Sequence, residues 1–119
     1  KTPRVQLNMD TGDFVISGRS IPEDAREFYE PIKKWLENYF RRETGFTSIL
    51  FEIYYFNTAS SKMILDIFYI VKHAVEKKHD VRVIWGVEKN DEEMLEAGED
   101  YAAIVNIPFE FRTIDIEDY

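Results

Sequence analysis

Hydrophobic and polar residues alternate at two places near the start of the chain. The first set spans residues 5–9 and the second spans residues 14–16. Successive side chains of a strand point to opposite faces, so this alternation predicts two short strands. The segment 10–13 between them contains a glycine, and we therefore expect a hairpin.

Apolar residues then recur at helical spacing between residues 28 and 40, which predicts an amphipathic helix. Ser20 and Glu23 have the spacing of a capping box, and Pro22 suits a first turn, so the helix is expected to begin at Ser20. Pro31 lies inside the pattern and predicts a kink or a later start, because its ring cannot fit an unbroken helix.

The middle of the chain holds an apolar run over residues 49–56, interrupted only by Glu52. Its β-branched and aromatic composition predicts a central strand covered on both faces. An apolar stripe at helical spacing follows and predicts a helix over residues 60–78, with cations at its C-terminal end.

The last third of the pattern predicts a strand over residues 81–85, a helix and a final strand. Asn90 with Glu93 has the spacing of a helix start. Phe109 and Phe111 alternate with polar residues in the last strand, and the acidic tail 115–119 is expected to fray. The order β-β-α-β-α-β-α-β predicts one α/β domain over residues 1–119, with a mixed, mostly parallel sheet of about five strands and three main helices.

The chain is acidic: its formal net charge is −8, and 11 acidic residues lie in the segment 88–119. We expect a solvated acidic face there, and a surface that attracts a basic protein is the alternative. Nucleic acid is not an expected partner, because phosphates repel such a chain. No apolar run approaches the roughly 20 residues of a membrane helix, and cysteine is absent. We expect a cytoplasmic protein without membrane insertion, metal or cofactor.

Few residues suit catalysis. The two histidines, His73 and His79, have no carboxylate at ligand spacing, so a metal site or a catalytic triad is not expected. There is no glycine-rich phosphate loop. Glu52 stands in a strongly apolar strand, where contact with a basic partner or an edge is the expected role and catalysis the weaker alternative.

Hydroxyl groups gather where the central strand meets its helix: Asn57, Thr58, Ser60, Ser61 and Lys62 lie in one short segment. Capping of the helix explains such a composition, because these side chains satisfy free N–H groups. By composition alone capping is favoured, and a phosphorylation site is the functional alternative, because a phosphate is stabilised by the positive end of a helix. The residues alone leave both readings open.

Four segments carry a resemblance to a known family, and the second is the most specific: 30–37 (EPIKKWLE), 55–62 (YFNTASSK), 64–67 (ILDI) and 96–101 (EAGEDY). They resemble the SiaC family of regulatory phosphoproteins, formerly a domain of unknown function. That family looks like a variant of the STAS fold of anti-sigma-factor antagonists, in which an Asp-Ser pair stands at the same strand-to-helix junction. Here Asn57 and Thr58 stand at that place.

The resemblance implies a non-enzymatic bacterial switch protein that works by partner switching. A GHKL-type kinase would phosphorylate Thr58, with Ser60 and Ser61 as alternative acceptors, and a PP2C-type phosphatase would remove the phosphate. The unphosphorylated form would bind and regulate an effector such as a diguanylate cyclase, through Asn57, Ser60, Ser61 and Lys62. The alternatives are a small-molecule or lipid-binding STAS-like domain and, less favoured, a hydrolase or transferase.

Overall fold

A computed structural model describes residues 2–42 and 44–114 of the chain. Its elements follow the predicted order, with helices α1 (Ala25–Phe40), α2 (Thr58–Glu76) and α3 (Glu92–Val105). The strands are β1 (Arg4–Asn8), β2 (Asp13–Ser20), β3 (Thr47–Phe56), β4 (Val81–Glu88) and β5 (Phe109–Ile114). They form one sheet in the order β1-β2-β3-β4-β5, in which β1 is antiparallel to β2 and the other pairs are parallel. The predicted α/β class with a mixed, mostly parallel sheet is confirmed.

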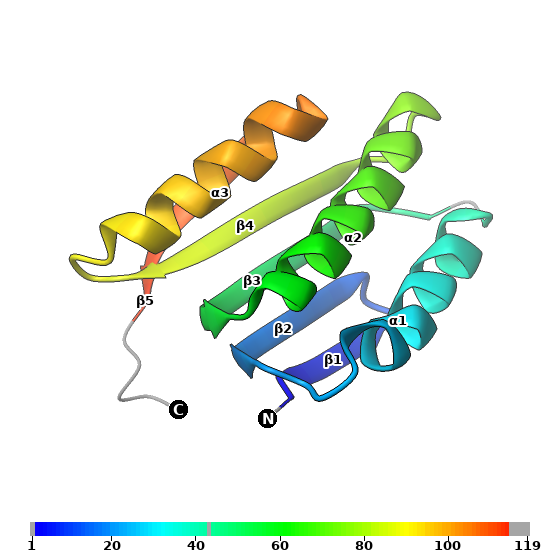
Figure 1. Cartoon of the computed structure of the whole chain (residues 1–119). Coiled ribbons are helices and arrows are strands. Elements are labelled where there is room, and N and C mark those ends of the chain that lie inside the picture. The colour runs from blue at the N-terminus through cyan, green and yellow to red at the C-terminus, as the bar shows by residue number, and fades with distance from the viewer. Residues whose placement is uncertain (1, 43, 115–119) are drawn as a thin grey trace.

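All three helices cover the same face of the sheet (Figure 1). Each helix connects a strand to its immediate neighbour, and the chain always moves along the sheet in the same direction. Right-handed crossovers of that kind place every helix on one side of the sheet. β3 is the central strand, as predicted, but the expectation that helices cover both its faces is wrong. Its burial alternates, so Phe51 and Ile53 are in the core while Leu50 and Tyr54 are half-buried on the helix-free face.

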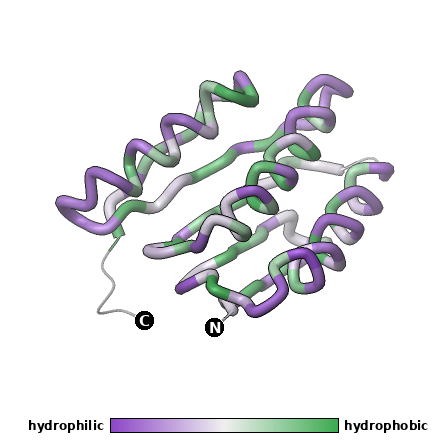
Figure 2. Tube along the Cα trace, viewed as in Figure 1, coloured by the Kyte–Doolittle hydropathy of each residue, from purple (hydrophilic) through white to green (hydrophobic). Residues whose placement is uncertain are grey.

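The core lies between the helices and the sheet, and the helices turn their polar residues outward (Figure 2). Aromatic rings fill its centre: Phe68 of α2 contacts Phe51, Trp85, Tyr101 and Phe109. The apolar stripe predicted for the second helix is therefore confirmed.

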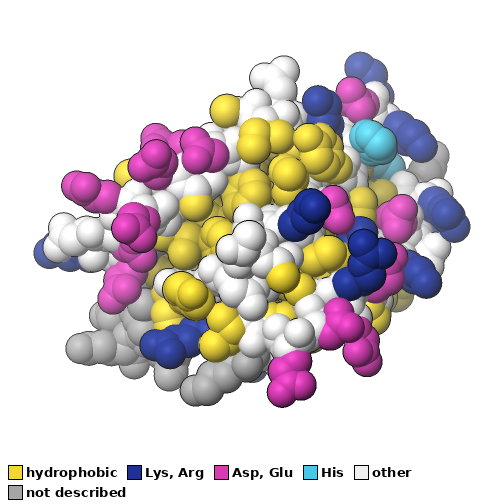
Figure 3. Space-filling model, viewed as in Figure 1, with side chains coloured by type: hydrophobic (Ala, Val, Ile, Leu, Met, Phe, Trp, Pro, Cys, Tyr) yellow, Lys and Arg dark blue, Asp and Glu magenta, His cyan; other side chains and the backbone are white. Residues whose placement is uncertain are grey.

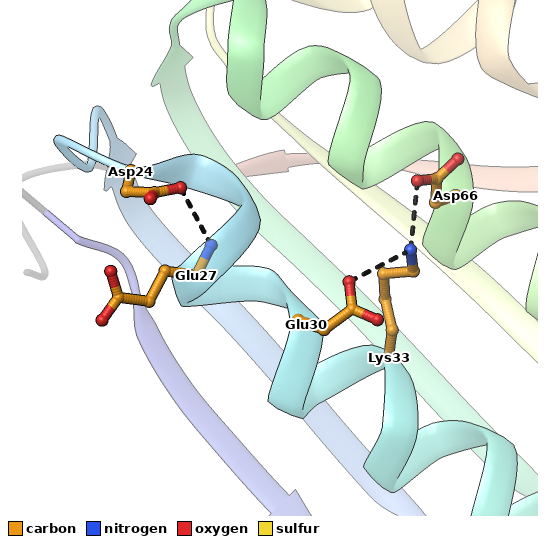
Figure 4. Close-up of polar contacts among 5 residues, drawn as sticks. All are labelled: Asp24, Glu27, Glu30, Lys33 and Asp66. Atoms are coloured by element: carbon orange, nitrogen blue, oxygen red, sulfur yellow. Dashed lines mark hydrogen bonds and ion pairs between the residues drawn. The ribbon is translucent and has the colours of Figure 1, made fainter.

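Helix α1 begins later than predicted. Its N-cap is Asp24, whose carboxylate accepts a hydrogen bond from the Glu27 amide at 3.0 Å (Figure 4). The predicted capping box at Ser20 is wrong, because Ser20 still belongs to β2 and its hydroxyl is buried among other partners. A start as late as Pro31 is also wrong, since this exposed proline lies inside the helix.

An ion pair joins α1 to α2 on the outer surface. The Lys33 ammonium lies 3.2 Å from the Asp66 carboxylate of α2 and 3.7 Å from the Glu30 carboxylate of its own helix (Figure 4). Because these carboxylates are partly exposed, the pair is expected to contribute little to stability, about 0–1 kcal/mol.

The other two helices also start at residues that differ from the predicted ones. α2 covers Thr58–Glu76 and not 60–78, with Asn57 as its N-cap. α3 is capped by Asp91 and not by Asn90, and the Asp91 carboxylate accepts from the Met94 amide at 3.0 Å. Asn90 has a φ of 68°, a left-handed conformation that asparagine adopts more easily than most residues, so it forms the preceding turn. The tail 115–119, expected to fray, lies outside the described residues.

Candidate functional site

The hydroxyl-rich segment lies at the carboxyl edge of the parallel strands, where β3 passes into α2. We call residues 57–62 the acceptor turn. Asn57 caps the helix: its side-chain oxygen accepts from the Ser60 amide at 2.9 Å, and its carbonyl accepts from the Ser61 amide at 2.9 Å. The Asn57 amide donates to the Ser20 carbonyl at 3.0 Å, which joins the turn to the end of β2. The capping role predicted for Asn57 is therefore present.

Thr58 is the first residue of α2 and is exposed to solvent. Within the described part of the chain, its hydroxyl has no hydrogen-bond partner, and the amides of Thr58 and Ala59 find no acceptor. Such free amides at a helix start, together with the positive end of the helix dipole, favour a negative group. Lys62, also exposed, lies one helical turn further on.

The first turn of α2 differs from those of its neighbours in charge. α1 carries Glu27 in its first turn, and α3 carries Glu92 and Glu93, whereas α2 has no acidic residue there. The positive end of α2 thus has no carboxylate of its own to compensate it. A phosphate on the exposed Thr58 would supply that charge.

Ser60 differs from Thr58, because it is fully buried. Its hydroxyl donates to the Ser20 carbonyl at 3.0 Å and accepts from the Ser20 hydroxyl at 2.9 Å. With both of those protons assigned, the Tyr29 hydroxyl of α1 is the donor in its short contact with the Ser20 hydroxyl. Burial raises the pKa of Tyr29, and the bonds to Ser20 and Ser60 offset part of that effect.

Ser61 is half-buried and is bonded to the other neighbouring helix. The Tyr101 hydroxyl of α3 lies 2.8 Å from the Ser61 carbonyl and 3.3 Å from the Ser61 hydroxyl, and it donates to them. Burial also raises the pKa of Tyr101. Sequence reasoning missed Ser20, Tyr29 and Tyr101 as partners of this segment, because Ser20 and Tyr101 are each 40 positions from the serine they contact.

The other candidates lie away from the acceptor turn. His73 is in the last turn of α2, and His79 lies beyond it, with its Nδ1 at 2.9 Å from the Thr44 hydroxyl. Fifteen residues of helix separate His73 from Thr58, a rise of about 22 Å. Glu52 is half-buried on the helix-free face, and its Cγ lies beside Gly86 of β4.

Residues 2–42 and 44–114 contain no group of three His, Asp or Glu side chains placed to hold a metal ion. None of the helices in these ranges is both long enough and apolar enough to span a bilayer. A cavity of about 240 Å³ lies beside the connection from β4 to α3, lined by Val87, Leu95 and Phe111 among others.

Charges of opposite sign gather on different parts of the helical face. Figure 3 shows acidic side chains along α3 and basic side chains with histidine near the far ends of α1 and α2. The exposed acidic residues of α3 are Glu92, Glu93, Glu96, Glu99 and Asp100. The solvated acidic face expected for the last quarter of the chain is thus located on this helix.

The fold of this chain is shared with proteins of known structure. A chain in the crystal structure of the Pseudomonas aeruginosa diguanylate cyclase SiaD with its activator SiaC superposes with a TM-score of 0.90, at 23% identity over 96% of this chain and 93% of that chain. A structure of SiaC from the same organism gives a TM-score of 0.82 at 23% identity, covering 97% of this chain and 90% of that chain. At such identities these matches show a shared fold.

Sequence comparison finds a curated, uncharacterized protein of Pseudomonas aeruginosa strain UCBPP-PA14 that is 24% identical over 96% of this chain and 90% of its own length. The model of the SiaC family regulatory phosphoproteins matches residues 1–114. The chain therefore belongs to the SiaC family of regulatory phosphoproteins, which are not enzymes.

Proposed function

We propose that the protein is a signalling switch that is phosphorylated reversibly on Thr58. The observation that carries the proposal is an exposed hydroxyl at a helix start with free amides and no acidic side chain in its first turn. Family membership supports phosphorylation as the signal, since the family consists of regulatory phosphoproteins. In the transfer, the Thr58 Oγ1–P bond forms as the bond between the γ-phosphorus of ATP and its bridging oxygen breaks, which releases ADP and the hydroxyl proton.

We propose a GHKL-type kinase and a PP2C-type phosphatase as the two enzymes that act on Thr58. The unphosphorylated form binds and activates an effector, for which a diguanylate cyclase is the first choice, because the structural relative SiaC is an activator of the cyclase SiaD. Such a kinase uses cytosolic ATP, so the proposal places the protein in the cytoplasm.

The effector contact includes the exposed and half-exposed parts of the acceptor turn, namely Asn57, Ser61 and Lys62 beside Thr58. A phosphate in such a contact would have to be desolvated, and an unpaired charge in an interface costs several kcal/mol. Ser60 is buried, so it contributes to the effector contact indirectly, by holding the acceptor turn in place.

The test combines phosphosite mapping with effector binding. With the kinase and ATP, the wild type is expected to gain one phosphate on Thr58, and Thr58→Ala is expected to gain none while it still binds the cyclase. Thr58→Asp is expected to bind less well, since one carboxylate copies part of the phosphate charge. Ser61→Ala is the matched control, and we expect normal labelling on Thr58.

Two results would overturn this proposal. The first is phosphate mapped to Ser60 or Ser61 while Thr58→Ala is still labelled. The second is equal cyclase binding by the wild type, Thr58→Ala and Thr58→Asp, measured by pull-down and by the rate of cyclic dinucleotide synthesis.

A further inference from the structure

Two tyrosines from different helices reach consecutive residues of the acceptor turn. Tyr29 of α1 bonds Ser20, whose hydroxyl donates to Ser60 at 2.9 Å, and Tyr101 of α3 donates to Ser61 at 2.8 Å. The first turn of α2 is thus linked to α1 through Ser20 of β2 and is bonded directly to α3.

Both tyrosine hydroxyls are buried, so the loss of their hydrogen-bond partners would destabilise the fold. Tyr29 is fully buried and Tyr101 is 6% exposed. A buried hydroxyl without a partner is destabilising, so each bond strongly favours the one arrangement of the turn that satisfies it. The bonds also occupy the hydroxyls of Ser60 and Ser61 and leave that of Thr58 without a bond among the described residues.

We propose that Tyr29 and Tyr101 are positioning residues of the switch. They hold the acceptor turn in the single geometry that presents Thr58, and they withhold Ser60 and Ser61 from the kinase. This selectivity rests on the proposed function, whereas the immobilisation of the turn does not. Removal of either tyrosine hydroxyl loosens the turn, and removal of the Tyr101 hydroxyl makes Ser61 a second acceptor.

Amide hydrogen exchange of the purified chain tests the immobilisation without a kinase. Tyr29→Phe and Tyr101→Phe are each expected to speed exchange of the amides of residues 60–63 about three- to ten-fold, the effect of one lost hydrogen bond. The matched control is Tyr39→Phe, which removes another buried hydroxyl of α1, bonded to Thr47 at 3.1 Å near the opposite end of that helix. Exchange of residues 60–63 that is equally fast in the control and in Tyr101→Phe would overturn the proposal.

Phosphosite mapping with the kinase and ATP tests the selectivity. We expect phosphate on Thr58 alone in the wild type and in Tyr39→Phe, and on both Thr58 and Ser61 in Tyr101→Phe. Adding Ser61→Ala to Tyr101→Phe is expected to restore a single label. Labelling of Tyr101→Phe on Thr58 alone, with unchanged kcat and KM, would refute the selectivity. A wild type that is never labelled on Thr58 refutes the proposed function, and the exchange comparison then decides the immobilisation by itself.

Discussion

Gly98 of α3 lies directly against the indole ring of Trp85 in β4, and a Cβ at position 98 would overlap ring atoms of that tryptophan. The indole N–H donates to the Met94 carbonyl of the same helix at 2.9 Å, so α3 both packs against the ring and hydrogen-bonds to it. Trp85 is 1% exposed, and the close packing of a protein core opposes a shift of its ring. The contact sets how closely α3 approaches the sheet.

Replacing Gly98 by Ala is therefore expected to destabilise the fold, by about 1–3 kcal/mol, because one methyl group is forced into a packed core. The measurement is the free energy of unfolding in urea. Gly45→Ala is the control, since a Cβ at that exposed position meets nothing within 4 Å. A Gly98→Ala variant as stable as Gly45→Ala would show that α3 can shift outward at little cost.

Phe68 is the second packing test. Its ring is fully buried among four other aromatic rings, so Phe68→Ala is expected to cost about 3–5 kcal/mol. The adjacent Tyr69 is 40% exposed, and Tyr69→Ala is expected to change the free energy of unfolding by about 0.5 kcal/mol or less. Similar melting temperatures for the two variants would contradict the assigned orientation of α2.

Asn57 allows the helix start to be tested apart from phosphorylation. Asn57→Ala removes the cap on the Ser60 amide and is expected to lower the stability by about 0.5–2 kcal/mol. Asn57→Asp keeps an acceptor oxygen and adds a negative charge at the uncompensated end of α2, so it is expected to be as stable as the wild type or up to about 1 kcal/mol more stable. Thermal melts of the two variants at low salt compare them, and a less stable Asn57→Asp would argue against an anion at this helix start.

The two raised tyrosine pKa values predict a loss of stability at alkaline pH. Burial raises the pKa of Tyr29 and of Tyr101 above the ordinary value of 10.0. Their neutral forms therefore favour the folded state below that value, and the benefit is lost as the pH rises from 10.0 through the higher folded-state pKa.

Urea unfolding from about pH 8 to about pH 11 measures this effect. The double variant with Tyr29→Phe and Tyr101→Phe is expected to lose less stability over that range, since neither ring ionises. All other side chains are common to the two proteins, so the difference between the two curves is the relevant quantity. Parallel curves would show that the buried hydroxyls ionise as easily as exposed ones.

The order of the elements followed from local patterns, because alternation and helical spacing are properties of neighbouring residues. The helix starts were harder to predict from sequence, because Ser20, Asn90 and Asp91 are all of residue types that cap helices. Only the tertiary packing decides which of them does so. Ser20 is drawn into the core by Tyr29 and Ser60 and is no longer available as a cap.

The candidate site, like the helix starts, could be predicted only in part from neighbouring residues. A short hydroxyl-rich segment and a family resemblance make Thr58 the candidate acceptor. Ser60 and Ser61 looked equivalent to it in sequence, and only burial and the bonds from distant tyrosines distinguish the three. Tyr101 and Gly98 belong to a segment that carried the resemblance, 96–101, and their contacts give that segment a physical role.

The separation of charge on the helical face also affects how the molecule meets its partners. The acidic residues of α3 and the exposed cations Arg41, Arg42, Lys77 and Lys78 place opposite charges on different parts of the described surface. A charged partner turns such a molecule during diffusion, before any atoms touch, over distances of about 10 Å at moderate salt. Encounters are thus pre-oriented, and their rate falls as ionic strength rises even where the final contacts are apolar.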